Sequence, residues 1–156
     1  MTAEAELLLL NASRAQLVRE VIRPALASGE AVLCDRFHDS TVAYQGYGRQ
    51  LDLKLIRTVI DFAVGETRPH LTLLMMVPVG TSEARRQERQ RNGPAVRDRF
   101  EEADRAFFER VEKGYQDIAA SEPRRVVLID STRDMAAVRA DIWRRTAALL
   151  EQAESA

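Results

Sequence analysis

Residues 33–46, LCDRFHDSTVAYQG, place side chains that can do chemistry directly after a short apolar run. The first of them are Asp35 and Arg36, which could form a structural ion pair. They could instead be a magnesium-associated carboxylate beside a phosphate-binding arginine, because Mg²⁺ prefers carboxylate and water oxygens and a guanidinium binds phosphate at two points. The sequence leaves both interpretations open, and the position after an apolar run strengthens the second.

A group of hydroxyl and amide side chains follows: Ser40, Thr41, Tyr44 and Gln45. These residues could cap and turn a short helix. They could also line a pocket for a planar ligand, since hydroxyl and amide groups hydrogen-bond to ring edges and a tyrosine packs beside the ring. Arg14 interrupts an otherwise apolar helical pattern, so it is either a solvated surface cation or a further ligand contact.

The third group is a run of arginines: Arg85, Arg86, Arg89, Arg91, Arg97 and Arg99. It flanks an Asn-Gly-Pro segment, so residues 91–98 are predicted to form a mobile loop. The run could be an exposed helix face balanced by neighbouring glutamates. It could also be a lid that brings positive charge over a transferring phosphoryl group and excludes water.

The composition narrows the class of protein. A chain of 156 residues with 46% hydrophobic and 30% charged residues fits a single globular domain. A net charge of −1 argues against a nucleic-acid-binding surface, and the longest apolar runs fall far short of the roughly 20 residues that cross a bilayer. Cys34 is the single cysteine and no signal sequence is visible, which indicates the cytoplasm. His38 and His70 are isolated, so no zinc site is expected.

The elements that must position these residues follow from apolar periodicity. Helical spacing covers residues 4–28, 51–65, 99–120 and 134–153, and an arginine-rich helix covers 81–91 with Thr81 or Ser82 as its cap. Continuous apolar runs predict buried strands at 31–35, 71–78 and 125–130. Strands that alternate with helices predict an α/β fold with a parallel sheet.

The carboxyl ends of parallel strands are where ligands bind in such sheets. Asp35-Arg36, Pro78 and Asp130-Ser131 lie at the carboxyl ends of the three predicted strands. We therefore expect the functional site at this edge of the sheet.

Five blocks of sequence resemble bacterial thymidylate kinases, in order and across essentially the whole chain. They are LLLLNASRAQLVREVIRPAL, LCDRFHDSTVAYQGYGR, LTLLMMVP, the arginine-rich stretch that ends in RDRFE, and VVLID. The resemblance implies a P-loop-kinase-like three-layer α/β/α fold, ATP- and Mg²⁺-dependent phosphorylation of dTMP to dTDP, and a homodimer. It implies one domain, with the acceptor-binding region and core at 1–80, a lid at about 81–99, and the last strand and helices at 100–156.

The resemblance also implies roles for single residues. Arg36 would bind the acceptor phosphate and Asp35 would lie near the magnesium ion. Arg14 and Thr41 would bind the thymine ring, and Tyr44 would pack near the sugar and disfavour a 2′-hydroxyl. The other implied site residues are Leu10, Ser40 and Gln45 in the acceptor pocket, the lid arginines Arg86, Arg89 and Arg97, and Ser131 and Thr132 in the loop that contacts adenine.

The chain also departs from the family pattern. No glycine precedes Gly29, so the first two strands and the Gly-x-x-x-x-Gly-Lys-[Ser/Thr] phosphate loop of the family are missing from this sequence. Because that loop holds the phosphates of ATP, we expect an amino-terminally truncated chain with negligible activity alone. The alternative is a non-catalytic nucleotide-binding or interaction module. Leu10 and Met76 stand where the family usually has phenylalanine and aspartate.

Overall fold

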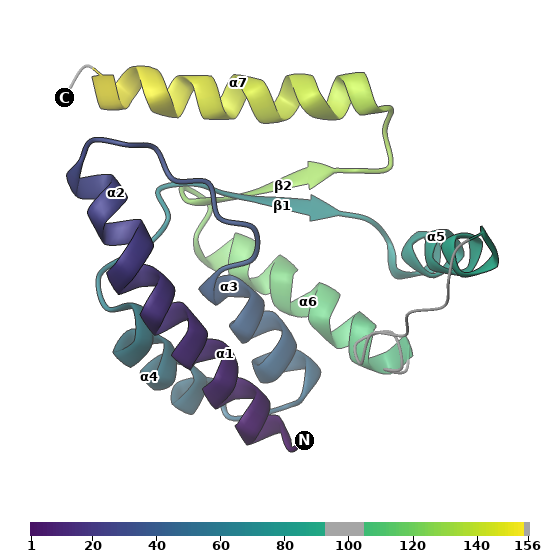
Figure 1. Ribbon diagram of the computed structural model, residues 1–156. Helices are drawn as coiled ribbons and strands as arrows, with labels where there is room; N and C mark the ends of the chain where they lie inside the picture. The colour runs from purple at the N-terminus through teal and green to yellow at the C-terminus, as the bar shows by residue number, and fades with distance from the viewer. Residues whose placement is uncertain (93–104, 155–156) are drawn as a thin grey trace. The chain divides into compact units, whose positions relative to one another are not determined.

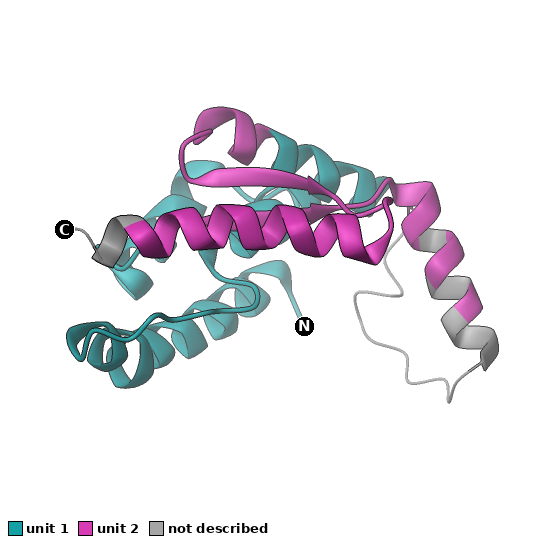
Figure 2. Ribbon diagram, turned by 90° about the horizontal axis from the view of Figure 1, so that it is seen from above, with its two compact units in different colours: residues 1–68, 106–116 teal, residues 69–105, 117–156 magenta. Residues whose placement is uncertain are grey.

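The computed structural model describes residues 1–92 and 105–154 (Figure 1). Its contacts divide the chain into two compact units, shown in teal and magenta in Figure 2. The first unit is Met1–Arg68 with Ala106–Gln116, and the second is Pro69–Arg105 with Asp117–Ala156. The single-domain organisation stays a prediction.

The first unit begins with a long helical segment that contains one wider turn. Its parts are α1 (Ala3–Leu17), the π-helical η1 (Val18–Ile22) and α2 (Arg23–Ala27). The Oγ1 atom of Thr2 accepts the N–H of Ala5 at 3.2 Å and caps the start of α1. Pro24 has no N–H and its ring excludes the ordinary helical bond, so the π turn lies where the chain adapts to it. The helix predicted over 4–28 is confirmed.

The rest of the first unit packs further helical segments around α1. They are α3 (His38–Thr41), the π-helical η2 (Val42–Gly48) and α4 (Leu53–Val64). Asp52 caps α4, since its Oδ1 accepts the N–H of Leu55 at 2.7 Å, and Gly65 ends the helix with a φ of +58°. The helix predicted over 51–65 is therefore confirmed. The apolar core joins α1 and η1 to α4 through Leu7, Val18, Ile22, Ile56, Ile60, Ala63 and Val64.

Residues 106–116 of α6 (Arg105–Ser121) complete the first unit against η2. Arg110 donates from Nε and Nη2 to the carbonyl of Gly48, at 3.2 and 3.0 Å. A Cβ atom at Gly48 would lie 2.6 Å from the Phe107 ring, so the close approach of the two segments requires glycine there.

The strand predicted at 31–35 is absent from the structure, and that prediction was wrong. Residues 30–34 have no regular secondary structure, and Leu33 is fully exposed. A strand exists only where a neighbour supplies hydrogen bonds to its backbone, and no strand among residues 1–92 and 105–154 pairs with this segment. Asp35 and Arg36 therefore lie in an irregular segment and not at the end of a strand.

The second unit contains the parallel sheet, as predicted. Strands β1 (Thr72–Met76) and β2 (Val126–Asp130) run parallel, in a register that pairs Thr72 with Val126 and Met76 with Asp130. α7 (Met135–Glu154) packs against β2 (Figure 1). The strands at 71–78 and 125–130 and the final helix are confirmed, and the described part of α6 agrees with the helix predicted at 99–120. The fold class is α/β.

Two details of the second unit differ from the predictions. α5 (Val79–Asn92) begins before Thr81 and Ser82, which lie in its first turn and do not cap it, because the N–H of Ser82 bonds to the carbonyl of Pro78 at 3.0 Å. The strands are also not buried throughout. Met75 and Leu128 are 49% and 47% exposed.

Two further observations concern the predicted mobile loop and the possibility of a membrane-spanning helix. The mobile loop predicted at 91–98 lies outside the described residues from residue 93 onward, as does the helix start predicted at 99–104. In the part of the chain that the structure describes, every helix is too short or too polar to cross a membrane.

Candidate functional site

α1 buries polar side chains on the same face as its apolar core residues. Leu7, Asn11, Arg14 and Val18 follow one another at helical spacing, and all four are buried. Glu6 lies beside them and is 4% exposed. Burying a polar group is costly unless it is hydrogen-bonded, so the partners of these side chains decide what the face can do.

Arg14 is a buried cation with unused donors. Its side chain is 9% exposed, and its Nε and Nη1 atoms have no hydrogen-bond acceptor among the described residues. Burial lowers the pKa of Arg14, and the nearby cation of Arg36 lowers it further. Thr41, which is fully buried, likewise has an Oγ1 atom without a partner in the described part of the chain. The arrangement fits a ligand rich in hydrogen-bond acceptors.

Arg36 lies over an aromatic ring. Its Cζ atom is 4.5 Å from the centroid of the Tyr44 ring, within the range of a cation–π contact. Its φ is +60°, which is uncommon for a residue other than glycine and recurs at functional sites. Tyr44 in turn meets Phe107 and Tyr115 edge-on, with centroids 6.0 and 6.3 Å apart. An exposed guanidinium is thus held against a supported aromatic surface.

Tyr115 links α6 to the polar cluster of α3. Its hydroxyl is 3.1 Å from the Oγ atom of Ser40. Burial raises the pKa of Tyr115, and the hydrogen bond with Ser40 opposes that shift in part. The phenol therefore stays protonated at neutral pH and can donate a hydrogen bond to Ser40 or accept one from it.

The structure brings most of the predicted acceptor-site residues into one unit. The contacts above connect Arg14 to Arg36, Arg36 to Tyr44, and Tyr44 to Ser40 through Tyr115. Thr41 is buried next to Ser40 in the same helix, α3. Leu10 is half-buried on α1, one turn before Arg14. Asp35 is exposed, and among the described residues no three His, Cys, Asp or Glu side chains are grouped so as to hold a metal ion.

Sequence reasoning missed three side chains that support this site: Glu6, Arg49 and Tyr115. Glu6 accepts hydrogen bonds from Gln45 and Arg49, which ties α1 to η2. The available signal was the spacing of Glu6, Leu10 and Arg14, which places two charged residues four positions either side of an apolar one on the same helix.

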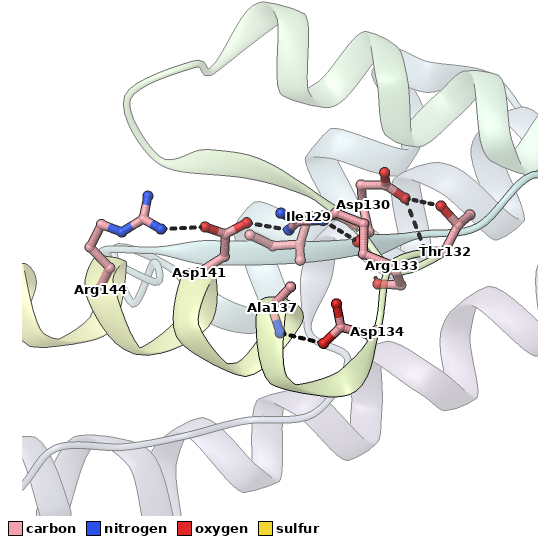
Figure 3. A network of polar contacts seen from close by, with 9 residues as sticks. Ile129, Asp130, Thr132, Arg133, Asp134, Ala137, Asp141 and Arg144 are labelled. Carbon is pink, nitrogen blue, oxygen red and sulfur yellow. Dashed lines mark hydrogen bonds and ion pairs between the residues drawn. The ribbon is translucent and has the colours of Figure 1, made fainter.

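The predicted adenine loop, at Ser131 and Thr132, lies in the second unit after β2 (Figure 3). The Oδ1 atom of Asp130 accepts both the N–H and the hydroxyl of Thr132, at 2.9 and 2.6 Å, and these bonds lower the pKa of Asp130. The N–H of Ser131 bonds to the carbonyl of Met76 at 2.9 Å, and its carbonyl accepts Nη2 of Arg85 at 3.2 Å. These bonds hold the loop backbone in place, and the Thr132 hydroxyl already donates its hydrogen to Asp130.

A surface network continues from this loop along α7 (Figure 3). Asp141 pairs with Arg133 and with Arg144, the latter at 2.7 Å, and the pair with Arg133 lowers the pKa of Asp141. Asp134 caps the helix, since its Oδ1 accepts the N–H of Ala137 at 3.0 Å.

Two features remain to be placed in the chain, the predicted lid arginines and a hollow in the second unit. Arg86 and Arg89 belong to α5, and Arg97 lies outside the described residues. A hollow of about 520 Å³ lies along α7 and contains none of the predicted site residues. Its lining is Ala136, Arg139, Ala140, Ile142 and Trp143.

Comparison with known proteins identifies the family. The family model described as thymidylate kinase matches residues 1–142. Thymidylate kinase of Desulforudis audaxviator is 44% identical over 97% of this chain and 66% of its own length, and that of Pseudomonas fluorescens is 46% identical over 98% and 70%. The crystal structure of thymidylate kinase from Ehrlichia chaffeensis superposes with a TM-score of 0.68 at 28% identity, over 94% of this chain and 65% of that one.

The chain thus spans about two thirds of the length of the relatives it matches. The match covers both units, including the α1, α3 and η2 segments that carry the buried polar cluster. This chain belongs to the thymidylate kinase family.

Proposed function

We propose that this chain carries the dTMP-binding part of a thymidylate kinase, which transfers the γ-phosphoryl group of ATP to a phosphate oxygen of dTMP and yields dTDP and ADP. The observation that carries the proposal is the pair of neighbouring cations Arg14 and Arg36, together with buried donors of Arg14 that have no acceptor among the described residues. A nucleoside monophosphate supplies ring carbonyls that can accept from Arg14 and a phosphate that a guanidinium such as that of Arg36 can bind at two points.

The proposed roles divide between the two ends of the nucleotide. Arg36, held over Tyr44, binds the acceptor phosphate. Arg14 and Thr41 bind the edge of the thymine ring, and Tyr44 packs near the sugar and disfavours a 2′-hydroxyl. Leu10, Ser40 and Gln45 complete the pocket.

The donor side of the reaction involves the second unit and a metal ion. We propose that the backbone at Ser131 and Thr132 contacts adenine and that Arg86, Arg89 and Arg97 stabilise charge on the transferring group. Asp35 is an exposed carboxylate, which fits the family's Mg²⁺ because that ion commonly takes one or two carboxylates and keeps several waters. Asp35 would hold it indirectly, and the ion would neutralise phosphate charge.

Turnover is expected to be negligible for these 156 residues alone. The sequence contains no Gly-x-x-x-x-Gly-Lys-[Ser/Thr] loop, whose backbone N–H groups and lysine stabilise the phosphates of ATP in P-loop kinases. We further propose a cytoplasmic homodimer without affinity for nucleic acid or membranes, in keeping with the single cysteine and the net charge of −1.

Calorimetric titration of the 156-residue chain with dTMP tests the proposal, alongside an assay of ADP formation from ATP and dTMP. We expect saturable binding of dTMP without measurable ADP. Arg36→Ala should weaken dTMP binding much more than thymidine binding, because thymidine lacks the phosphate that Arg36 is proposed to bind, whereas loss of the Arg36 contact with the Tyr44 ring affects both ligands alike. Arg57→Ala, which removes an exposed arginine of α4, is the matched control. A flat titration would refute dTMP binding, and measurable ADP would refute the need for the phosphate loop.

A further inference from the structure

Glu6 is a buried carboxylate to which the proposed function gives no role. Acidic residues are rarely buried to this degree unless they are paired. Its Oε1 atom accepts the Nε2 hydrogen of Gln45 at 2.7 Å. Arg49 approaches both carboxylate oxygens, with Nε 3.4 Å from Oε1 and Nη2 3.2 Å from Oε2. Charge-assisted hydrogen bonds therefore join α1 to η2 at this point.

η2 is the segment whose shape this joint supports. The N–H of Arg49 bonds to the carbonyl of Tyr44 at 2.8 Å, five residues earlier, as in a π-helix. Such turns are rare and recur at functional sites. Side-chain contacts from outside the turn can hold it in place, and Glu6 supplies them to Gln45 within η2 and to Arg49, the residue that caps its end.

Arg49 also connects Glu6 to the ring of Tyr44. The Arg49 guanidinium lies 4.8 Å from the centroid of Phe107, and Phe107 meets Tyr44 edge-on. The position of Tyr44 is thus determined through its backbone bond to Arg49 and through the ring that Arg49 covers.

We infer that Glu6 is a positioning residue that determines how well the site distinguishes a deoxyribonucleotide from a ribonucleotide. The inference rests on the proposed function. Glu6 and Arg14 are separated by about 12 Å along α1, at 1.5 Å per residue, so Glu6 does not reach a base held by Arg14. It instead sets the spacing between Arg14 on α1, proposed to bind the base, and Tyr44 on η2, proposed to disfavour a 2′-hydroxyl.

Loss of the carboxylate should therefore alter selectivity. A looser Tyr44 admits a 2′-hydroxyl more readily, whereas general weakening of the fold reduces the affinity for both nucleotides alike. The ratio of the dissociation constants of 5-methyluridine 5′-monophosphate and dTMP separates the two effects.

Calorimetry on the 156-residue chain measures this ratio for the unaltered protein, for Glu6→Gln and for Glu4→Gln. Glu4 lies in the same first turn of α1 and is exposed, so Glu4→Gln removes the same charge without the network. In Glu6→Gln we expect the ratio to fall by about threefold, which is less than the tenfold change that about 1.4 kcal/mol produces. Glu4→Gln should leave the ratio unchanged.

A second variant separates positioning from stability. Glu6→Gln leaves the Arg49 charge partly buried without its carboxylate, which lowers the thermal midpoint of unfolding. The double variant Glu6→Leu/Arg49→Met removes both charges and should recover the midpoint while the ratio stays low. An unchanged ratio in folded Glu6→Gln, or a ratio that recovers with the midpoint, would overturn the inference and leave dTMP binding standing. Failure of the unaltered chain to bind dTMP would refute the proposed function itself.

Discussion

In the first unit, polar side chains are buried and several of their atoms lack protein partners, whereas in the second unit polar side chains lie at the surface and bond to one another. Asn11 Oδ1, Arg14 Nε and Nη1, Thr41 Oγ1 and Gln45 Oε1 have no hydrogen-bond partner among the described residues. Around α7, by contrast, the carboxylates of Asp130, Asp134 and Asp141 all accept hydrogen bonds.

The difference matters because burial sets the cost of an unsatisfied group. A buried donor without an acceptor costs about 1–3 kcal/mol, whereas an exposed ion pair contributes at most about 1 kcal/mol and is screened by salt. A buried cluster with unused donors is retained at a cost to stability, which is a property of binding sites. The groups of the surface network are open to water, which can satisfy them without a ligand.

Arg14→Ala should give the largest effect on binding and a small effect on stability. Charged hydrogen bonds contribute about 1.5–3 kcal/mol, so we expect dTMP affinity to fall about 10- to 100-fold in calorimetry. The free energy of unfolding should change by less than about 1 kcal/mol, because the loss of packing is offset by removal of a desolvated cation. Denaturant titration measures the second quantity.

Arg57→Ala is again the matched control, because it removes an exposed arginine from the same unit. A large loss of stability in Arg14→Ala with unchanged dTMP affinity would show that Arg14 serves the fold. The contrast between the two units would then lose its main support.

Tyr115→Phe tests a buried polar contact that is satisfied. The variant keeps the ring against Tyr44 and removes the hydrogen bond with Ser40, so we expect a loss of about 0.5–1.5 kcal/mol in the free energy of unfolding at neutral pH. Ser40→Ala and the double variant Ser40→Ala/Tyr115→Phe complete a double-mutant cycle. A coupling energy near zero in that cycle would show that the hydrogen bond contributes nothing to the free energy of unfolding.

The pH dependence distinguishes the two single variants. Because the pKa of Tyr115 is raised in the folded state, the stability it contributes is present below the ordinary value of 10.0 and is lost as the pH rises towards the folded value. Ser40→Ala keeps this alkaline loss, whereas Tyr115→Phe removes the part due to residue 115. If the free energy of unfolding falls with rising alkaline pH in the same way in both variants, the raised pKa of Tyr115 is refuted.

Local patterns were sufficient to predict most of the fold. The helices α4 and α7 and the strands β1 and β2 are encoded by periodicity and by apolar runs that need no distant partner to be visible. The prediction of a strand at 31–35 failed because an apolar run becomes a strand only beside another strand, and none of the described strands pairs with it. The predicted start of the arginine-rich helix at residue 81 was too late, because the Pro78 carbonyl already accepts a helical hydrogen bond from the N–H of Ser82.

The candidate site was predictable only in part. Arg36, Ser40, Thr41 and Tyr44 are neighbours in sequence, so their types and spacing were enough to select them. Their supporting contacts join residues far apart, such as Ser40 with Tyr115 and Gln45 with Glu6, 75 and 39 positions away. A glutamate in a helical pattern usually predicts a solvated face, and only the packed helices show that Glu6 is buried.

Asp141→Asn should give the smallest effect, because it disrupts the exposed network of the second unit. Screening by water and salt leaves little net energy in its pairs with Arg133 and Arg144, so the thermal midpoint measured by circular dichroism should be unchanged in high salt. Asp134→Ala, which removes the cap of α7 from the same loop, should lower the midpoint and shows that the measurement can detect a local loss.

Acidification sharpens this last test. The pKa of Asp141 lies below its ordinary value of 3.8 in the folded protein, so its contribution is present above that value and is lost as the pH falls through the folded pKa. Asp141→Asn should remove only that part of the acid dependence, since the pKa of Asp130 is lowered by Thr132 independently. A large drop in midpoint at neutral pH and high salt would mean that the surface network bears as much of the stability as the buried one, and the proposed contrast between the units would fail.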